Sequence, residues 1–137
     1  HVTPRYQVPI YKQQPDLREA FNRYAAYHKP YHGAICDLRR KVRNTHGRVV
    51  HLNCHSLPSV LLEGNAPYPY DIIIGTRDGT SAAPQLTEKL RELFAARGYR
   101  VTVNAQGFRG AEILRRSGKP DKHSHAIQIE INRALYL

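Results

Sequence analysis

Two short segments of this chain alternate apolar and polar side chains, and this alternation constrains the fold more than any other feature. The segments run from Arg48 to Ser56 and from His125 to Asn132. Successive side chains of a β-strand point to opposite faces, so both segments are predicted to be strands with one apolar and one polar face. In the first, Val50, Leu52 and Cys54 oppose His51, Asn53 and His55; in the second, Ile127, Ile129 and Ile131 oppose Gln128, Glu130 and Asn132.

The polar faces of these strands indicate a functional site. A buried imidazole, amide or carboxylate loses about 1–3 kcal/mol when it has no partner, so such groups are costly on core strands unless they line a site. His55 and Glu130 each lie towards the carboxyl end of a predicted strand. A histidine and a carboxylate in these positions predict metal-assisted hydrolysis.

Helical periodicity marks three other regions. It begins after Pro15, and Pro30 is expected to stop the first helix and to begin a second, which Asn44 to Gly47 breaks. Pro84 opens a further helix that ends at Gly98. A short helix is expected at about 111–116.

The strands alternate with these helices. Asp71 to Gly75 is an apolar run typical of a strand covered on both faces, and Val101 and Val103 mark another strand. This order predicts a single α/β domain over residues 1–137, with a mostly parallel or mixed sheet and flanking helices. Ligands of open α/β sheets bind beyond the carboxyl ends of the strands. His55, the 77–81 turn, the 104–110 loop and Glu130 are therefore expected at one edge.

Composition limits the classes of protein. The 137 residues are 41% hydrophobic and 23% charged, as in ordinary soluble domains. No stretch approaches the roughly 20 apolar residues that cross a bilayer, so a membrane partner is not expected. The only cysteines, Cys36 and Cys54, form neither a disulfide framework nor a CxxC pair. A cytoplasmic location is expected.

A net charge of +10 is compatible with binding to nucleic acid through phosphate contacts. The densest basic cluster, Arg39 to Arg43, lies late in a predicted helix, where positive charge also complements the helix dipole. No basic stripe is interleaved with aromatic residues, and no RNA-recognition or helix-turn-helix signature is present. We interpret the cluster as a solvated helix face and retain a nucleic-acid-binding module as an alternative.

Several motifs together resemble the N-formylglutamate amidohydrolase family over nearly the whole chain. They are Pro30-Tyr31-His32, Asn53-Cys54-His55-Ser56, Gly75-Thr76-Arg77-Asp78-Gly79-Thr80-Ser81, Arg109-Gly110 and His125-Ala126-Ile127-Gln128-Ile129-Glu130. The resemblance implies a carboxypeptidase-like (phosphorylase/hydrolase-like) fold. It also implies a zinc enzyme that hydrolyses N-formyl-L-glutamate to formate and L-glutamate, or an amide hydrolase close to it. The family's Pro-His-Ser-Gly-like motif has no match before His55, so we expect this chain to be the C-terminal part of a longer enzyme.

The resemblance also implies roles for individual residues. His55 would be a zinc ligand, Glu130 the general base or acid, and Arg109 a contact for a substrate carboxylate. Zinc lowers the pKa of its bound water to about 7, which provides hydroxide at neutral pH. Arginines bind carboxylates in a bidentate fork, which suits a small anionic amino-acid derivative. The substrate-binding set is therefore Arg77, Arg109 and Asn132, and the residues expected to support the site from behind are Asn53 and Gln128.

Simpler interpretations stay open. A histidine at a strand end is often only a hydrogen-bonded structural residue, and Glu130 could pair with an arginine. The family usually has an acidic residue where this chain has Asn53, so a non-catalytic remnant of the fold is a second alternative. Zinc retention that His55→Ala abolishes would favour the enzyme, whereas binding that falls steeply with salt would favour nucleic acid.

Overall fold

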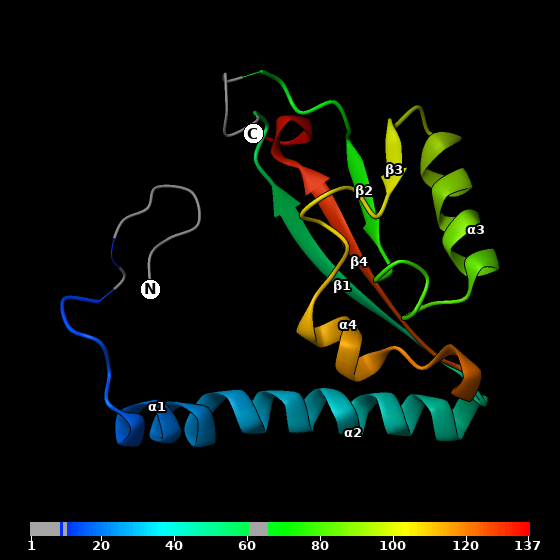
Figure 1. The fold of residues 1–137 in the computed structure, drawn as a ribbon. Coiled ribbons are helices and arrows are strands. Elements are labelled where there is room, and N and C mark those ends of the chain that lie inside the picture. Colours follow the sequence, from blue (N-terminus) through cyan, green and yellow to red (C-terminus); the bar gives the residue numbers. More distant parts are fainter. Residues whose placement is uncertain (1–8, 10, 61–65) are drawn as a thin grey trace. The chain divides into compact units, whose positions relative to one another are not determined.

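The computed structural model describes residue 9 and residues 11–60 and 66–137, and Figure 1 shows its ribbon. Residues 61–65, within the predicted loop before the second strand, lie outside the described part. The chain divides into two compact units, His1–Leu38 and Arg39–Leu137. None of the described helices is both long enough and apolar enough to cross a membrane.

The first unit is helical. It contains α1 (Leu17–Arg23), the π-helical turn η1 (Tyr24–His28) and the first part of α2 (Lys29–His46), which continues into the second unit. Asp16 caps α1, because its side chain accepts a 2.7 Å hydrogen bond from the backbone N–H of Glu19. The apolar side chains that gave this region its helical periodicity are exposed: Leu17 is 91% accessible and Phe21 66%.

The prediction that Pro30 separates two helices is wrong, because the helical backbone continues through it. Proline lacks the N–H that the ladder needs, and its ring crowds the carbonyl four residues earlier. Just before Pro30 the ladder changes to π spacing, in which the N–H of Lys29 donates to the carbonyl of Tyr24. This wider turn shifts the local pairing and accommodates the proline.

The second unit contains a four-stranded sheet, in the order β1-β4-β2-β3. Its strands are β1 (Val49–Leu57), β2 (Ile72–Gly75), β3 (Val101–Val103) and β4 (Ser124–Asn132). All four were expected from the sequence. β1 pairs with β4 and β2 with β3 in parallel, whereas β2 and β4 are antiparallel. The sheet is therefore mixed, and the predicted α/β class with flanking helices is confirmed.

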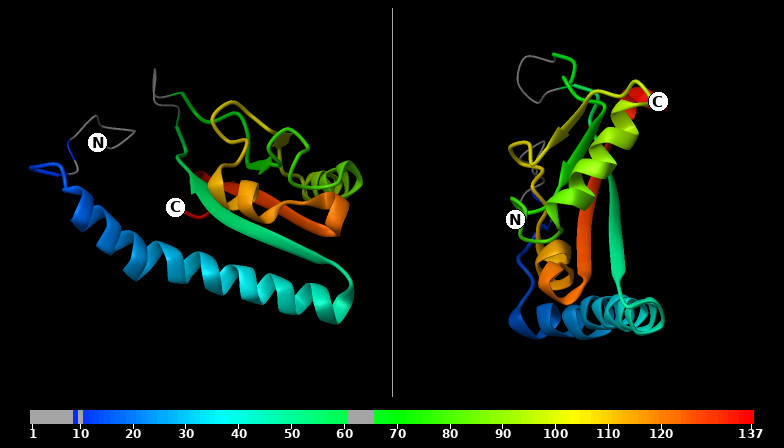
Figure 2. Two further views of the ribbon diagram at one scale, coloured as in Figure 1. Left: turned by 60° about the horizontal axis from the view of Figure 1, so that its bottom comes forward. Right: turned by 90° about the vertical axis from the view of Figure 1, so that its right-hand side faces the viewer.

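The helices of this unit follow the predicted positions. α3 spans Pro84–Ala95 and α4 spans Glu112–Ser117, and short 3₁₀ turns, η2 (Pro120–Lys122) and η3 (Arg133–Leu135), flank β4. Figure 2 shows α3 running alongside the sheet. Gly98 follows α3 with a φ of +86°, a conformation that glycine adopts without steric cost.

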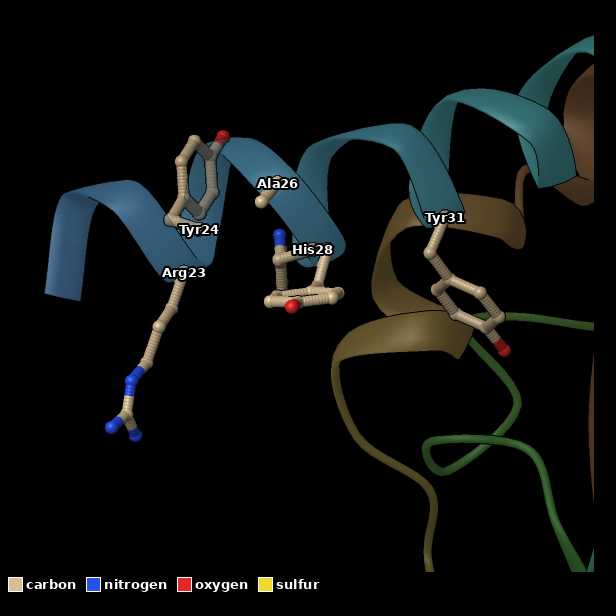
Figure 3. Close-up of a pocket in the computed structure, with 6 residues that line it drawn as sticks. Arg23, Tyr24, Ala26, His28 and Tyr31 are labelled. Atoms are coloured by element: carbon tan, nitrogen blue, oxygen red, sulfur yellow. The ribbon is translucent and has the colours of Figure 1, made fainter. Parts of the chain in front are cut away.

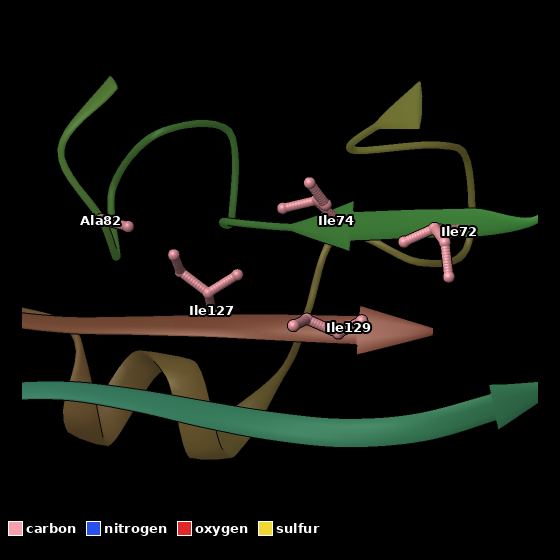
Figure 4. Close-up of a cluster of buried hydrophobic side chains, with 5 residues drawn as sticks. All are labelled: Ile72, Ile74, Ala82, Ile127 and Ile129. Atoms are coloured by element: carbon pink, nitrogen blue, oxygen red, sulfur yellow. The ribbon is translucent and has the colours of Figure 1, made fainter. Parts of the chain in front are cut away.

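The hydrophobic core lies between β2, β4 and α3. Its buried members are Ile72, Ile74, Ala82, Ile127 and Ile129, and Figure 4 shows the isoleucines of the two strands together. Leu86, Leu90 and Phe94 of α3 pack against them. Burying one such isoleucine or leucine side chain contributes about 1.5–3 kcal/mol, so the apolar faces of β2 and β4 fix the position of α3.

The antiparallel pairing of β2 with β4 corrects the expectation that four polar segments share one sheet edge. His55 and Glu130 follow parallel strands and share an edge. β2 runs the opposite way, so its last residue, Gly75, lies beside Gln128, while Ile73 lies beside Glu130. The loops after β2 and β3 consequently begin at the other end of the sheet.

Candidate active site

His55 and Glu130 form the centre of the candidate site. They are direct register partners on parallel strands and therefore lie on the same face of the sheet. Nδ1 of His55 lies 4.0 Å from Oε1 of Glu130; the histidine side chain is 46% exposed and that of Glu130 only 7%. The Nε2 amide of Gln128 donates a 2.7 Å hydrogen bond to the same oxygen. One buried carboxylate thus lies between an amide donor and an accessible imidazole.

Burial governs the protonation of Glu130. Removal from water raises the pKa of its carboxyl above the ordinary value, while the nearby His55 and the Gln128 hydrogen bond act in the opposite direction with smaller effect. A carboxyl whose pKa is raised towards neutrality both takes and returns protons more readily at working pH. Glu130 therefore has the environment of a general base or acid.

Tyr68 belongs to the surroundings of Glu130, and sequence reasoning missed it. Burial and the negative charge of Glu130 together raise the pKa of the Tyr68 phenol. Phe108 packs edge-on against Tyr68, with ring centroids 5.8 Å apart. Tyr68 lies in a Pro-rich loop without periodicity, so only the folded structure shows that it approaches Glu130.

The 104–110 loop reaches the same polar face of β4. A hollow of about 260 Å³ is lined by Gly107, Arg109, Gly110, Ala111 and Gln128. Gln128 both lines this hollow and donates to Glu130. The structure therefore brings Arg109 to the hollow beside Gln128, the residue that donates to Glu130, although the strand before its loop ends at the other edge.

Hydrogen bonds from backbone N–H groups hold the loops after β2 and β3 together. The N–H of Arg77 donates to the carbonyl of Arg109 at 2.6 Å. The side-chain oxygen of Asn104 accepts from the N–H of Thr76 at 2.8 Å. Arg77, Asp78 and Asn104 have φ values of +50°, +56° and +53°, which are uncommon for residues other than glycine. Such conformations cluster at functional sites, where the surrounding structure maintains them.

Arg109 is paired in this structure. Its Nη1 lies 3.1 Å from Oδ2 of Asp78, and both side chains are exposed. Exposed ion pairs contribute little and exchange readily with other anions. The guanidinium is therefore positioned beside the hollow and remains accessible to a competing carboxylate.

The other predicted site residues differ in their surroundings. Asn132 is buried, and its amide donates to the carbonyl of Tyr70 and accepts from the N–H of Ala134, both at 2.9 Å. These bonds join the last residue of β4 to the segment before β2 and to the turn η3. Asn53 is the register partner of Gln128 and shares its face. Substrate binding by Arg77 and Asn132 and the supporting role of Asn53 stay predictions.

A zinc ion needs more ligands than this face provides. Catalytic zinc usually takes three protein ligands. Within residue 9, residues 11–60 and residues 66–137, no three histidine, cysteine or carboxylate side chains are grouped to hold a metal. His55 and Glu130 offer two donors, so the described residues do not by themselves complete a zinc site.

A second hollow lies on the first unit (Figure 3). Its volume is about 950 Å³, and its walls are Arg23, Tyr24, Ala26, Tyr27, His28 and Tyr31. The rings of Tyr24 and His28 stack with centroids 5.0 Å apart. Among the residues that the structure describes, no carboxylate lines this hollow, so they provide no acid–base pair like that of Glu130 and His55.

Comparison with known proteins agrees with the resemblance seen in the motifs. The family model for N-formylglutamate amidohydrolase matches residues 1–137. An N-formylglutamate deformylase of Pseudomonas aeruginosa is 30% identical over 135 residues, covering 94% of this chain and 49% of the relative. One of Pseudomonas putida is 34% identical over 113 residues, covering 80% and 41%.

A solved structure gives the same result. The crystal structure of N-formylglutamate amidohydrolase from Ralstonia eutropha superposes with a TM-score of 0.82 at 31% identity, covering 95% of this chain and 48% of that chain. This chain thus spans about half the length of the relatives that it matches. By sequence and by fold, it belongs to the N-formylglutamate amidohydrolase family.

Proposed function

We propose that this chain provides the acid–base residue and a substrate-carboxylate contact of an amidohydrolase that converts N-formyl-L-glutamate to formate and L-glutamate. The observation that carries the proposal is Glu130, a buried carboxylate with a raised pKa, 4.0 Å from His55 and bonded to Gln128. The names of the relatives, deformylase and amidohydrolase, support the reaction class.

Glu130 carries the proton transfers in this proposal. Its carboxylate takes a proton from the attacking water as the water oxygen bonds to the formyl carbon. The same proton then passes to the amide nitrogen as the carbon–nitrogen bond breaks, which releases the amine of glutamate and leaves formate. Gln128 holds one carboxylate oxygen, so the other is directed to the reacting water.

Arg109 binds a carboxylate of the substrate. A guanidinium matches a carboxylate through two parallel hydrogen bonds, and Arg109 already lines the hollow beside Gln128. The incoming carboxylate replaces Asp78 as its partner. The net charge of +10 raises the local concentration of an anionic substrate. Arg77 and Asn132 are assigned to the same substrate, and a cytoplasmic location fits the free cysteines Cys36 and Cys54.

Zinc dependence, with His55 as one ligand, is part of the proposal. It is supported by the accessible imidazole beside the buried Glu130. Since the described residues do not assemble three ligands, the proton steps above are assigned to Glu130 alone. Further ligands would come from outside these residues.

The test is metal content by mass spectrometry, together with formate release from N-formyl-L-glutamate with and without added zinc, both on the chain co-expressed with the half of the Ralstonia eutropha relative that this chain does not cover. About one zinc per chain and zinc-dependent formate release, both lost in His55→Ala, are expected. Formate release that is indifferent to zinc would refute the metal assignment while keeping the reaction. No formate under either condition would favour the non-catalytic remnant, which the incomplete ligand set also supports.

Arg39 of the basic cluster makes contacts within the second unit, which differs from the solvated helix face expected from the sequence and favours a structural role for this residue over nucleic-acid binding. Arg39 donates a 2.5 Å hydrogen bond to the hydroxyl of Ser124, and it also donates to the carbonyl of Ser117. Binding of duplex or single-stranded nucleic acid that weakens steeply with salt would contradict this interpretation.

A further inference from the structure

His28 and His32 lie next to each other on the helix of the first unit. His28 is the last residue of the π-helical turn η1, and His32 lies in α2 four residues later. Residues four apart on a helix are neighbours on one face. The two imidazole rings have centroids 4.3 Å apart and planes tilted by 52°, and both side chains are half-buried. One face of the helix thus presents two nitrogen ligands together.

One ring nitrogen of His28 indicates a missing partner. Nδ1 of His28 is shielded from solvent and has no hydrogen-bond partner among the residues that the structure describes. Buried polar atoms nearly always have a partner, so an exception indicates a group that the polypeptide itself does not supply. A metal ion would be such a group, because it takes the lone pair that otherwise accepts a hydrogen bond.

The surroundings hold the two imidazoles in place. Tyr24 stacks on His28 with centroids 5.0 Å apart and planes 27° apart, and Tyr31 meets His32 edge-on at 5.3 Å. Figure 3 shows Tyr24, His28 and Tyr31 along the same helix. Pro30, between the histidines, restricts the backbone. Side chains that are already restricted lose less entropy when they bind a ligand, so the pair is pre-organised.

The charges near the pair are compatible with a cation. Arg23 lines the same hollow as His28, but its guanidinium is paired with the carboxylate of Glu19 and donates a 2.9 Å hydrogen bond to the hydroxyl of Tyr11. An arginine whose charge is balanced in this way opposes a second cation less than an unpaired one would.

We propose that His28 and His32 bind a divalent transition-metal ion, with one ring nitrogen of each as ligand. Imidazole suits Zn²⁺, Ni²⁺ and Cu²⁺, and histidines four apart on a helix are a known arrangement for binding zinc. Among these ions Cu²⁺ is expected to bind most tightly. Cys36 does not complete a triad, because no group of three such donors occurs in the part of the chain that the structure describes. Water fills the remaining positions, so the ion is exchangeable.

The ion would join the π-helical turn to α2. Its two ligands lie on either side of Pro30, where the backbone lacks an N–H for the helical ladder. An ion that binds only the helical arrangement stabilises that arrangement. We therefore assign the ion a structural role, and His28 and His32 take no part in the proposed function.

A copper titration tests the site. The chain is co-expressed with the half of the Ralstonia eutropha relative that it does not cover, washed with metal-free buffer and titrated with Cu²⁺. Wild type is expected to bind one ion more than His28→Ala or His32→Ala, with two imidazole nitrogens visible by electron paramagnetic resonance. Loss of either ligand should weaken binding by more than the roughly 10–100-fold that loss of an outer-shell partner costs.

A matched variant tests the spacing of the histidines rather than their number. His32→Ala combined with Gly33→His keeps two histidines but moves the second by about 100° around the helix. A Cβ at Gly33 meets nothing within 4 Å, so the position has room for a side chain. This double variant should lose the ion, whereas His46→Ala, at an exposed histidine of α2, should keep it. Circular dichroism on each variant verifies that the fold is retained.

Three results would overturn the assignment: equal copper binding by wild type and His28→Ala, equal binding by the variant with the shifted histidine, or loss of the ion in His55→Ala. The last would assign the ion to the candidate active site. Formate release by the washed complex, before copper is added, is a separate readout. A copper ion that His28→Ala removes from a complex without formate release would support this site while refuting the proposed function.

Discussion

Gln128 and Glu130 lie two residues apart on the same face of β4, and the Gln128 amide donates a 2.7 Å hydrogen bond to the Glu130 carboxylate. This bond favours the ionised form, whereas burial favours the protonated form, and burial has the larger effect. Because the two residues are neighbours on one face of the strand, the Gln128 amide holds one oxygen of the Glu130 carboxylate in place.

Replacing the carboxylate tests whether Glu130 transfers protons. Glu130→Gln keeps the size of the side chain and removes the proton acceptor, so formate release is expected to fall by about 10²–10⁴-fold. Initial rates of formate release, on the chain co-expressed with the half of the Ralstonia eutropha relative that this chain does not cover, would measure it. Glu88→Gln, at an exposed carboxylate of α3 paired with Arg91, is the control and should retain full activity. A Glu130→Gln enzyme of normal rate would refute the assignment.

The raised pKa of Glu130 predicts a pH dependence of stability. Because the pKa of the folded state lies above the ordinary 4.5, the protonated carboxyl is favoured by folding. Its contribution is fully present below the unfolded pKa and is lost as pH rises through the folded value. Urea unfolding across this range should therefore show wild type losing stability relative to Glu130→Gln as pH rises above about 4.5. A constant difference between the two proteins would contradict the pKa direction.

The pair between Asp78 and Arg109 predicts a change in substrate affinity. Asp78→Asn removes the resident partner of the guanidinium, so KM for N-formyl-L-glutamate is expected to fall by up to about fivefold, the size of an exposed ion pair. Arg109→Ala should raise KM instead. Asp121→Asn, at another exposed carboxylate, is the control. Equal KM values for Asp78→Asn and wild type would show that Asp78 does not compete with the substrate.

The loop after β3 packs closely against Gly75, the last residue of β2. A Cβ at this position would lie 2.6 Å from the carbonyl oxygen of Phe108 and 3.0 Å from the carbonyl carbon of Arg109. Backbone atoms cannot yield as a flexible side chain does, so Gly75→Ala should cost about 1–3 kcal/mol in the free energy of unfolding and displace Arg109. Chemical denaturation measures the cost.

The helix α2 contains a matched control for that variant. A Cβ added at Gly33 meets nothing within 4 Å, and the residue is helical. Gly33→Ala is expected to be neutral or to stabilise by up to about 1 kcal/mol, since alanine is the better helix former. Similar destabilisation in both variants would show that loop packing is not the cause.

Much of the second unit could be predicted from the sequence because its signals are local. The alternation in β1 and β4, the apolar run of β2 and the leucine stripe of α3 each reflect burial along one element. His55 and Glu130 could be named as candidate site residues for the same reason, since each lies on the polar face of its own strand. The structure adds that these faces adjoin.

The features that sequence reasoning missed depend on longer paths of the chain. The segment between β1 and β2 has no periodicity, so the sequence does not show in which direction β2 runs. β2 is antiparallel to β4, and the expectation of one shared edge was therefore wrong. Tyr68 lies in the segment between β1 and β2, and only the tertiary fold brings it near Glu130. Arg109 reaches the polar face of β4 because its loop is bonded to the turn after β2, and the residue spacing does not encode this contact.

The π-helical turn before Pro30 changes which side of the long helix the residues on either side of it face. A π turn holds one residue more per hydrogen-bonded ring than an α turn, and one residue corresponds to a rotation of about 100° around the axis. Apolar positions before Tyr24 and those after His28 therefore follow two separate phases, although they share one continuous helix. Removing a single residue between Tyr24 and His28 would merge the phases and turn one half of the helix surface relative to the other.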